Sequence, residues 1–400
     1  MAALCGLRGK LSQYGWMEMQ TFQAVEQSRL PALPGVRVIA LGEPNHGSAE
    51  VFALRVQLVL DAVSHGATVV ALEAPTDTVT ALDQVVQGEV PWDDDLLRGI
   101  ASWPWRVVEA KLLVQVLRQA NSVGGPGVRL VGVDPQVPVL AATALVRWLR
   151  SRGPVSDRDE RVCRVLATLR AGARLRWGVR ERAGELIADA SAAGGLDLKQ
   201  AGALHDALRL TASRRRDVSR ATSTRDEVMA ARVLAHLPED GRLVLLAHNG
   251  HISRTGYAGG SMRSTGQCLT AVLGEGYWAA GTVVGGGSFR ARRRLLGVPL
   301  RGEVVAIPDS SPDSSVEARL GELASGSVAG RVDLMDAVPE RLAGELSTRS
   351  AGWVVDALTW PLTFEMVDLE TAYDSVFWVA QVHPTTELPG GFLEPDLGSQ

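Results

Sequence analysis

The chain has 400 residues, 46% of them hydrophobic and 22% charged, and a formal net charge of −4 at pH 7. This composition is typical of a globular protein with one large or two smaller domains, and it excludes the strongly basic surface of a nucleic-acid or anionic-membrane binder. No apolar run approaches the ~20 residues of a spanning helix, and the three cysteines show no C-x-x-C spacing. Because the N-terminus also lacks a long apolar export segment, we expect a cytoplasmic protein.

After a polar lead-in over residues 1–35 with one possible helix, the first predicted unit is a strand–helix–strand over residues 36–73. The β-branched, apolar run 36–41 is short enough to be a strand buried on both faces. Ser48 can cap the helix that follows, and the apolar run 68–72 predicts a second buried strand. In open α/β sheets ligands bind beyond the carboxyl ends of the strands, so polar residues at these ends are candidates for a site.

The helix between these strands carries a charge on its apolar side. At about 100° per residue, Arg55 falls among apolar side chains, whereas Glu50 falls on the polar face and is expected to be solvated. A buried guanidinium needs an anionic partner, and we expect this partner to be Glu43 or Glu73. The alternative is an arginine that extends to a nearby surface, or a purely structural ion pair.

The remaining predicted elements follow in chain order: helices at 77–86 and 107–120, a buried strand at 128–133, several helices over 138–237, a buried strand at 243–247, a helix at 267–273, and strands at 278–284, 303–307, 352–357 and 376–382. We therefore predict an α/β fold with a mixed, mostly parallel sheet and flanking helices. Residues 1–137 and 238–400 are expected to form the two parts of this core. Residues 138–237 are expected to form a helical insertion or lid over the carboxyl edge of the strands.

Ionisable residues end or follow four of the predicted strands: Glu43 and His46, then Glu73, then Asp134, and finally His248 with His251. If these strands are neighbours in one parallel sheet, the side chains converge on one edge. Four such coincidences favour a catalytic site over a structural accident.

The absence of several motifs narrows the chemistry. The chain has no G-x-S-x-G elbow, no G-x-x-x-x-G-K-[ST], no G-x-G-x-x-G that opens a helix and no H-E-x-x-H. The clustered histidines and carboxylates could ligate zinc. Equally, His46 could take a proton from water while a carboxylate orients its ring and Arg55 or a second histidine stabilises an oxyanion. We expect neither a metal nor a cofactor, because a base network satisfies all of these groups.

Five segments in this order carry a resemblance: ALGEPNHGSAEVFALR, VVALE, GVDPQ, STRDEVMAARV and LLAHNGHIS. Together they resemble the erythromycin esterase family, over about residues 36–290 and 372–390. The resemblance implies a mixed α/β core with a helical region over the cleft, and metal-free hydrolysis of an ester. It implies that His46 is the base and that four polar residues surround it: Glu43, Arg55, Glu73 and His248. The chain departs from the family at Asn45, where threonine is common, and at Pro135, where methionine is frequent.

The residues that we expect to contact the substrate lie around this group: Asn45, Trp105, Arg106, Asp134, Asn249 and His251. The predicted function is hydrolysis of a macrolide-type ester or lactone, a reaction that would serve antibiotic resistance. One alternative is a tailoring enzyme of secondary metabolism that uses the same site for elimination, cyclisation or acyl transfer. Another is a binding protein that has lost catalysis. We expect a small-molecule substrate and no nucleic-acid or membrane partner.

Overall fold

The computed structural model describes residues 29–100, 102–124, 127–211, 218–257, 261–308, 311–335, 338–352 and 354–390. The helix predicted within the lead-in falls outside these ranges, apart from residues 29–35, which carry no helix.

A central sheet of eight strands organises the molecule, in the order β3-β2-β4-β1-β5-β13-β9, with β8 paired to β5. The strands are β1 (Val38–Leu41), β2 (Ala67–Pro75), β3 (Arg129–Asp134), β4 (Arg242–Leu246), β5 (Tyr277–Arg290), β8 (Val304–Ala306), β9 (Ala329–Asp333) and β13 (Ser375–Val382). Strands β1 to β5 and β13 pair in parallel, whereas β8 and β9 are antiparallel. The prediction of a mixed, mostly parallel α/β sheet is therefore confirmed.

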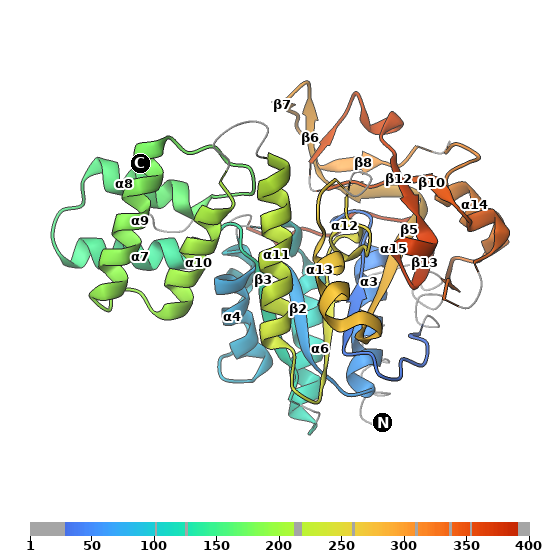
Figure 1. The fold of residues 1–400 in the computed structure, drawn as a ribbon, viewed down its shortest axis with the longest axis horizontal. Helices are drawn as coiled ribbons and strands as arrows, with labels where there is room; N and C mark the ends of the chain where they lie inside the picture. The colour runs from blue at the N-terminus through green and yellow to red at the C-terminus, as the bar shows by residue number, and fades with distance from the viewer. Residues whose placement is uncertain are drawn as a thin grey trace.

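Helices cover both faces of this sheet (Figure 1). One face buries α3 (Ala49–Ser64), α4 (Thr76–Val86), α5 (Asp94–Arg98) and α6 (Val108–Ser122) in a shared apolar core. The other face packs against α11 (Val218–His236), α13 (Thr265–Leu273), α14 (Val316–Ala324) and the short α15 (Leu369–Ala372). Burial on both faces explains why the central strands are continuous apolar runs and show no alternation.

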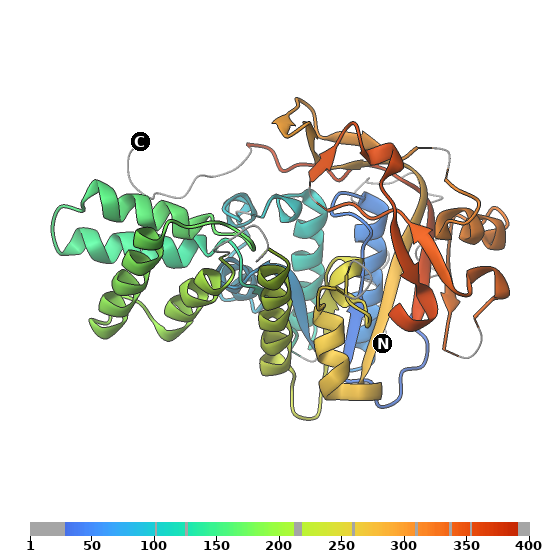
Figure 2. The same cartoon turned by 45° about the horizontal axis from the view of Figure 1, so that its top comes forward.

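Four helices form a separate group beside β3, away from the centre of the sheet (Figures 1 and 2). They are α7 (Val139–Ser151), α8 (Asp157–Ala167), α9 (Trp177–Ala192) and α10 (Leu198–Arg209), and they share an apolar core of their own. We name this group the helical subdomain. Helix α11 belongs instead to the sheet, because Met229 and Val233 are buried against its strands. A covering role of the subdomain stays a prediction, as does the division of the chain into domains.

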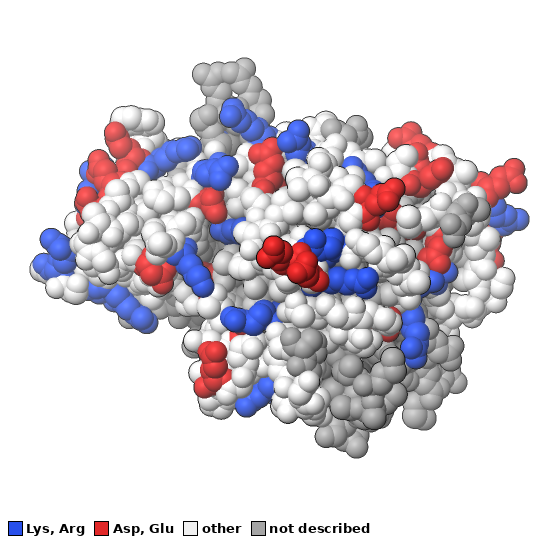
Figure 3. Space-filling model, turned by 60° about the horizontal axis from the view of Figure 1, so that its bottom comes forward, with Lys and Arg blue, Asp and Glu red and all other residues white. Residues whose placement is uncertain are grey.

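Two smaller sheets stand apart from the central one: β6 (Arg292–Leu295), β7 (Val298–Pro299) and β11 (Val354–Asp356) form the first, and β10 (Glu345–Thr348) and β12 (Glu365–Asp368) form the second. In the described parts of the chain, no helix is both long and apolar enough to cross a bilayer. Charged side chains of both signs are interspersed on the face drawn in Figure 3, so no field of a single sign dominates it.

Helix α3 corrects one prediction from the sequence. Glu50 is only 2% exposed, although its helical position predicted a solvated side chain. The chain that leaves β13 passes over this face, and the carboxylate of Glu50 accepts hydrogen bonds from the backbone N–H and Nδ1 of His383, at 2.7 and 2.6 Å. Ser48 is the N-cap residue, as predicted, but its hydroxyl donates to Asn45 Oδ1 at 2.8 Å and does not cap the helix.

Candidate active site

The carboxyl ends of four parallel strands meet at one cavity of about 300 Å³. Its lining includes the six ionisable residues that the sequence places after these strands, namely Glu43, His46, Glu73, Asp134, His248 and His251. It also includes Ser102, Pro104, Gln136, Val137, Arg170, Ala171, Arg225 and Gly352, among others. The prediction that the strand ends converge is therefore confirmed.

Next to β1, three side chains form a linear group that we name the base triad: His46, Glu43 and Arg55. The Nδ1–H of His46 donates to Glu43 Oε1 at 2.9 Å, and Arg55 forms an ion pair with the other oxygen of that carboxylate. Arg55 is only 2% exposed, and of its two predicted partners, Glu43 and Glu73, it pairs with Glu43. Burial raises the pKa of Glu43, but the charges of Arg55 and His46 outweigh burial, so its pKa is lowered and it stays ionised.

This pairing decides the tautomer of His46. Because a carboxylate accepts the hydrogen bond at Nδ1, the proton of a neutral His46 ring lies on Nδ1, and Nε2 carries the lone pair. Within the described ranges, no protein group bonds Nε2, and the ring lines the cavity. A carboxylate that orients a histidine in this way fixes its tautomer and can stabilise its imidazolium, so the arrangement suits general-base catalysis.

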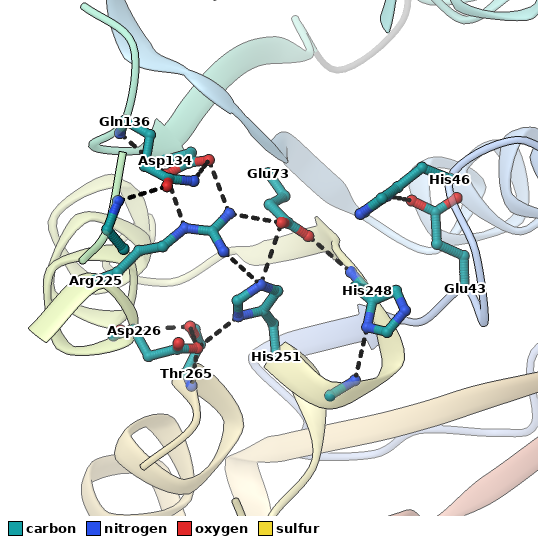
Figure 4. Close-up of polar contacts among 12 residues, drawn as sticks. Glu43, His46, Glu73, Asp134, Gln136, Arg225, Asp226, His248, His251 and Thr265 are labelled. Atoms are coloured by element: carbon teal, nitrogen blue, oxygen red, sulfur yellow. Dashed lines mark hydrogen bonds and ion pairs between the residues drawn. The ribbon is translucent and has the colours of Figure 1, made fainter. Parts of the chain in front are cut away.

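A second group of charges lies beside the base triad, and we name it the arginine network: Arg225, Glu73, Asp134, His251 and Asp226 (Figure 4). Arg225 Nη2 donates to Glu73 Oε1 at 2.6 Å and to Asp134 Oδ2 at 2.8 Å, while Nε donates to Asp134 Oδ1 at 3.1 Å. Burial raises the pKa of Glu73 and of Asp134, but the cations around them lower both pKa values overall. Strands β2 and β3 are thus joined to α11 by one guanidinium.

His251 closes this network. Its Nδ1 lies 2.7 Å from Asp226 Oδ1 and also contacts the Tyr257 hydroxyl, and its Nε2 lies 3.2 Å from Glu73 Oε1. Burial lowers the pKa of His251, but the Asp226 and Glu73 carboxylates raise it to about 9. Arg225 Nη1, at 2.8 Å from Nε2, opposes protonation but is outweighed by the two carboxylates. The two carboxylates thus favour the protonated form of His251 in the folded protein.

His248 differs from both other histidines. It is the N-cap residue of α12 (Asn249–Ile252), its backbone N–H donates to Glu73 Oε2 at 2.8 Å, and its ring lies 5.3 Å from the ring of His46. Nδ1 accepts the Gly250 N–H at 3.3 Å, so the ring proton lies on Nε2 and points to the Pro44 carbonyl at 3.2 Å. Burial and the charge of His46 lower the pKa of His248 to about 4. The ring is a neutral donor at pH 7 and no base.

Of the residues predicted to contact substrate, Trp105, Asp134 and His251 line the cavity. Trp105 lies in the 3-10 turn Trp103–Trp105, and its Nε1–H donates to the Glu73 carbonyl at 3.0 Å. This carbonyl is available because the pairing register of β2 and β3 shifts between Leu72 and Pro75.

The other three predicted contacts, Asn45, Arg106 and Asn249, do not line the cavity. Asn45 Oδ1 accepts the Gly47 N–H at 3.1 Å, and Asn249 joins the start of α12 to β5 by donating to the Thr282 carbonyl at 2.7 Å. A side chain on Gly42 would collide with this amide, since its Cβ would lie 2.2 Å from Asn249 Oδ1. Both amides have structural roles here, and substrate binding by these three residues stays a prediction.

Sequence reasoning missed Arg225, Arg170 and Tyr257. Asp226 is a charge among the apolar side chains of α11, and it accepts hydrogen bonds from His251 and from the Thr265 N–H, which lies at 2.8 Å. Arg225 is the next residue back along α11, so a buried acid beside an arginine was the available signal. In the ranges described, no group of three or more His, Cys, Asp or Glu side chains is arranged to hold a metal ion.

Comparison of the sequence with known protein families finds a match to one family. The sequence profile of the family described as erythromycin esterase matches residues 63–382. No curated protein matches the chain. Among solved structures, the chain is similar to a protein from Bacillus cereus, with a TM-score of 0.69 and 19% identity over 89% of this chain and 91% of that one.

Two further structures are similar at comparable identity. A succinoglycan biosynthesis protein has a TM-score of 0.67 and 15% identity, over 93% of this chain and 100% of that one. A histidine-to-asparagine mutant of the erythromycin esterase EreC, in its open conformation, has a TM-score of 0.61 and 19% identity, over 88% of this chain and 92% of that one. At these identities the structural likeness establishes the fold alone.

Proposed function

The chain belongs to the erythromycin esterase family, and from this premise we propose that it hydrolyses a carboxylic ester or lactone bond with a water molecule that His46 activates. Family membership supports an ester hydrolase. The observation that carries the more specific proposal is the state of the three cavity histidines. Only His46 combines a carboxylate at Nδ1 with an Nε2 that no described protein group occupies, whereas His248 and His251 have partners at both ring nitrogens.

The proposed reaction begins when His46 Nε2 takes a proton from water as the water oxygen attacks the ester carbonyl. Glu43 then stabilises the imidazolium that forms, because its carboxylate accepts the Nδ1–H. When the tetrahedral intermediate collapses, the C–O bond to the alcohol breaks and the imidazolium returns its proton to the leaving oxygen. The products are a carboxylic acid and an alcohol, so the substrate gains one water in total.

Two other residues have distinct proposed roles. His248 would donate its Nε2–H to the oxyanion, since its bond to the Pro44 carbonyl, at 3.2 Å, is long and easily exchanged. Arg55 does not line the cavity, so we assign it to positioning and charging Glu43 and not to the oxyanion. This replaces the hypothesis that Arg55 itself stabilises the developing negative charge.

The substrate that we propose to test first is a macrolide lactone, because the structurally similar EreC is named as an erythromycin esterase. A cavity of about 300 Å³ is at the small end of the range for ligand pockets, so it would hold the scissile ester and its neighbouring groups and not a whole macrolide. The rest of such a substrate would lie outside the cavity.

The experiment is incubation of the purified protein with a panel of macrolides and other lactones, followed by mass spectrometry. Hydrolysis adds the mass of one water, whereas elimination or cyclisation in a tailoring reaction does not. A product without added water that forms in the wild type and is lost in His46→Asn would contradict hydrolysis and assign His46 to proton transfer within the substrate.

A further inference from the structure

The chain that leaves β13 runs between two segments that line the active-site cavity, and we name its residues 383–388 the β13 strap. On one side the strap pairs with the chain that follows the histidine of the base triad. The Ala49 N–H donates to the His383 carbonyl at 2.9 Å. The Thr385 N–H donates to the Gly47 carbonyl, also at 2.9 Å. The turn that carries the proposed base is therefore fixed to the strap through its backbone.

The other side of the strap holds a different part of the cavity wall. The Val108 N–H donates to the Thr386 carbonyl at 2.9 Å. The Leu388 N–H donates to the Arg106 carbonyl at 3.2 Å. These bonds directly follow the turn Trp103–Trp105, which lines the cavity. The strap therefore joins the turn that carries the base to a turn that forms part of the cavity wall.

The end of β5 supports this junction. The Arg290 N–H donates to the Gly47 carbonyl at 3.0 Å, and the Arg290 guanidinium pairs with Glu387 of the strap at 2.8 Å. The same guanidinium lies over the Trp103 ring, 5.2 Å from its centre. A side chain on Gly47 would collide with this backbone, since its Cβ would lie 1.9 Å from the Arg290 carbonyl oxygen. The base turn, the strap and the cavity wall are thus packed as one unit.

Two buried carboxylates hold the strap in place. Glu50 and Glu109 are 2% and 6% exposed, and they lie in the first turns of α3 and α6, where the helix dipole favours a negative charge. Glu50 accepts the backbone N–H and the Nδ1–H of His383, and Glu109 accepts the Thr386 N–H at 3.0 and 3.2 Å. Burial raises the pKa of Glu109 to about 7, although its own N–H, the Thr386 N–H and the charge of Arg290 lower it. A buried acid is costly unless donors meet it, and in both cases the strap supplies a donor.

We propose that the β13 strap positions the active site, with Glu50 and Glu109 as the positioning residues that hold it. Glu50 acts through the strap on the turn of His46, and so sets the approach of the base to the ester. Glu109 acts through the strap on the turn of Trp105, and so sets the wall against which the substrate lies. The catalytic part of this inference rests on the proposed function, whereas the attachment of the two turns to the strap does not.

Steady-state kinetics with the lactone of the panel that the wild type hydrolyses test the two roles. Glu50→Ala should lower kcat about 10-fold and leave KM nearly unchanged, because a displaced base slows the chemical step. Glu109→Ala should raise KM about 10-fold and lower kcat less, because a displaced wall weakens substrate binding. Glu50→Gln and Glu109→Gln should stay close to the wild type, since an amide oxygen still accepts the backbone N–H of the strap. A loss of stability alone would not produce this split between kcat and KM.

The matched control is Asp157→Ala, which removes an exposed carboxylate from the first turn of α8 in the helical subdomain and should keep the wild-type kcat and KM. Thermal melting of each variant establishes folding. Wild-type kinetics in either folded alanine variant, or glutamine variants as impaired as the alanine variants, would overturn the inference.

Amide hydrogen exchange followed by mass spectrometry separates this inference from the proposed function. Exchange should become about 10-fold faster in peptides that contain Ala49 for Glu50→Ala, and in peptides that contain Val108 for Glu109→Ala, because these N–H groups donate to carbonyls of the strap. If no lactone of the panel is hydrolysed but exchange responds in this way, the hydrolase proposal fails and the role of the strap stands. If exchange is unchanged in both variants, the strap does not hold the two turns, whatever the kinetics show.

Discussion

The two charge groups at the cavity are built in opposite ways. The base triad comes from one turn and one helix, residues 43–55, and its histidine keeps one ring nitrogen without a described protein partner. The arginine network draws on β2, β3, α11 and α12, and both ring nitrogens of its histidine are occupied. The triad therefore resembles a poised base, whereas the network resembles a clamp that joins separate elements around it.

This difference suggests that the base triad serves reactivity and the arginine network serves stability. A catalytic base needs an accessible lone pair, so one of its nitrogens has no hydrogen-bond partner within the protein. When the base lies in a local turn, this missing hydrogen bond does not weaken the rest of the fold. A buried group of several charges is tolerated only when nearly every member has a partner. We expect substitutions in the triad to change turnover and substitutions in the network to change the free energy of unfolding.

The largest expected effect is at His46. His46→Ala should lower turnover about 10³-fold or more with little change in the melting temperature, because it removes the base and leaves the pairing of Arg55 with Glu43 in place. The control is His65→Ala, whose side chain is largely exposed and far from the cavity lining, and which should be nearly silent. Turnover of the true substrate close to the wild-type rate in a folded His46→Ala protein would show that His46 is not the base.

The network counterpart is Arg225→Met. This change leaves Glu73 and the buried Asp134 without their shared cation, so the free energy of unfolding should fall by about 3–5 kcal/mol. Urea denaturation at pH 7 measures it. Arg220→Met, at an exposed position on the same helix, should change the free energy by no more than about 0.5 kcal/mol. A loss no larger for Arg225→Met than for Arg220→Met would show that the network does not act as a clamp.

Arg55 tests whether the triad acts as one unit. Arg55→Ala should lower turnover by about 10²-fold, because Glu43 loses the cation that keeps it charged and oriented toward His46. KM should change little, since Arg55 does not line the cavity. Arg55→Lys should not restore the rate fully, because an ammonium lacks the planar fork. Steady-state kinetics that retain wild-type turnover in Arg55→Ala would reject the positioning role.

The smallest effect concerns the pH dependence of stability. Burial lowers the pKa of His251, but Asp226 and Glu73 raise it to about 9 in the folded chain, above the ordinary value of 6.5. The stability that this proton contributes is fully present below pH 6.5 and is lost as the pH rises through about 9. The free energy of unfolding should fall by about 1 kcal/mol per pH unit in this window.

His251→Gln removes the titrating group and should make this slope shallower than in the wild type. Urea denaturation at four pH values between 6 and 9 compares the two proteins. Identical slopes would mean that His251 is not held as a cation in the folded state.

Local chain geometry explains which parts of the site could be predicted from the sequence. A buried strand, a turn and a capped helix follow one another within residues 36–64, so Glu43 and His46 are three residues apart in one turn and can reach each other. Arg55 is on the inward-facing side of the helix that follows this turn. Because a buried guanidinium needs an anion, its partner had to be an acid at the nearby strand ends. Parallel strands also share one edge, which brings the four polar strand ends together.

The partners within the arginine network depended on tertiary structure. A hydrophobic pattern predicts that Asp226 is buried, but which cation meets it depends on how α11 crosses the ends of β2 and β3. The same limit explains the error at Glu50, because helical periodicity cannot anticipate that the chain after β13 covers a polar face.

Arg170 is the extreme case. Its loop lies in the helical subdomain, and hydrogen bonds through Gln136 and Val137 attach this loop to the chain after β3, at the cavity. The sequence by itself determined the strand ends and the nearness of Glu43, His46 and Arg55, because these three residues belong to one strand–turn–helix unit. The tertiary structure decided which charges from distant elements meet, because such contacts depend on the packing of whole helices against the sheet.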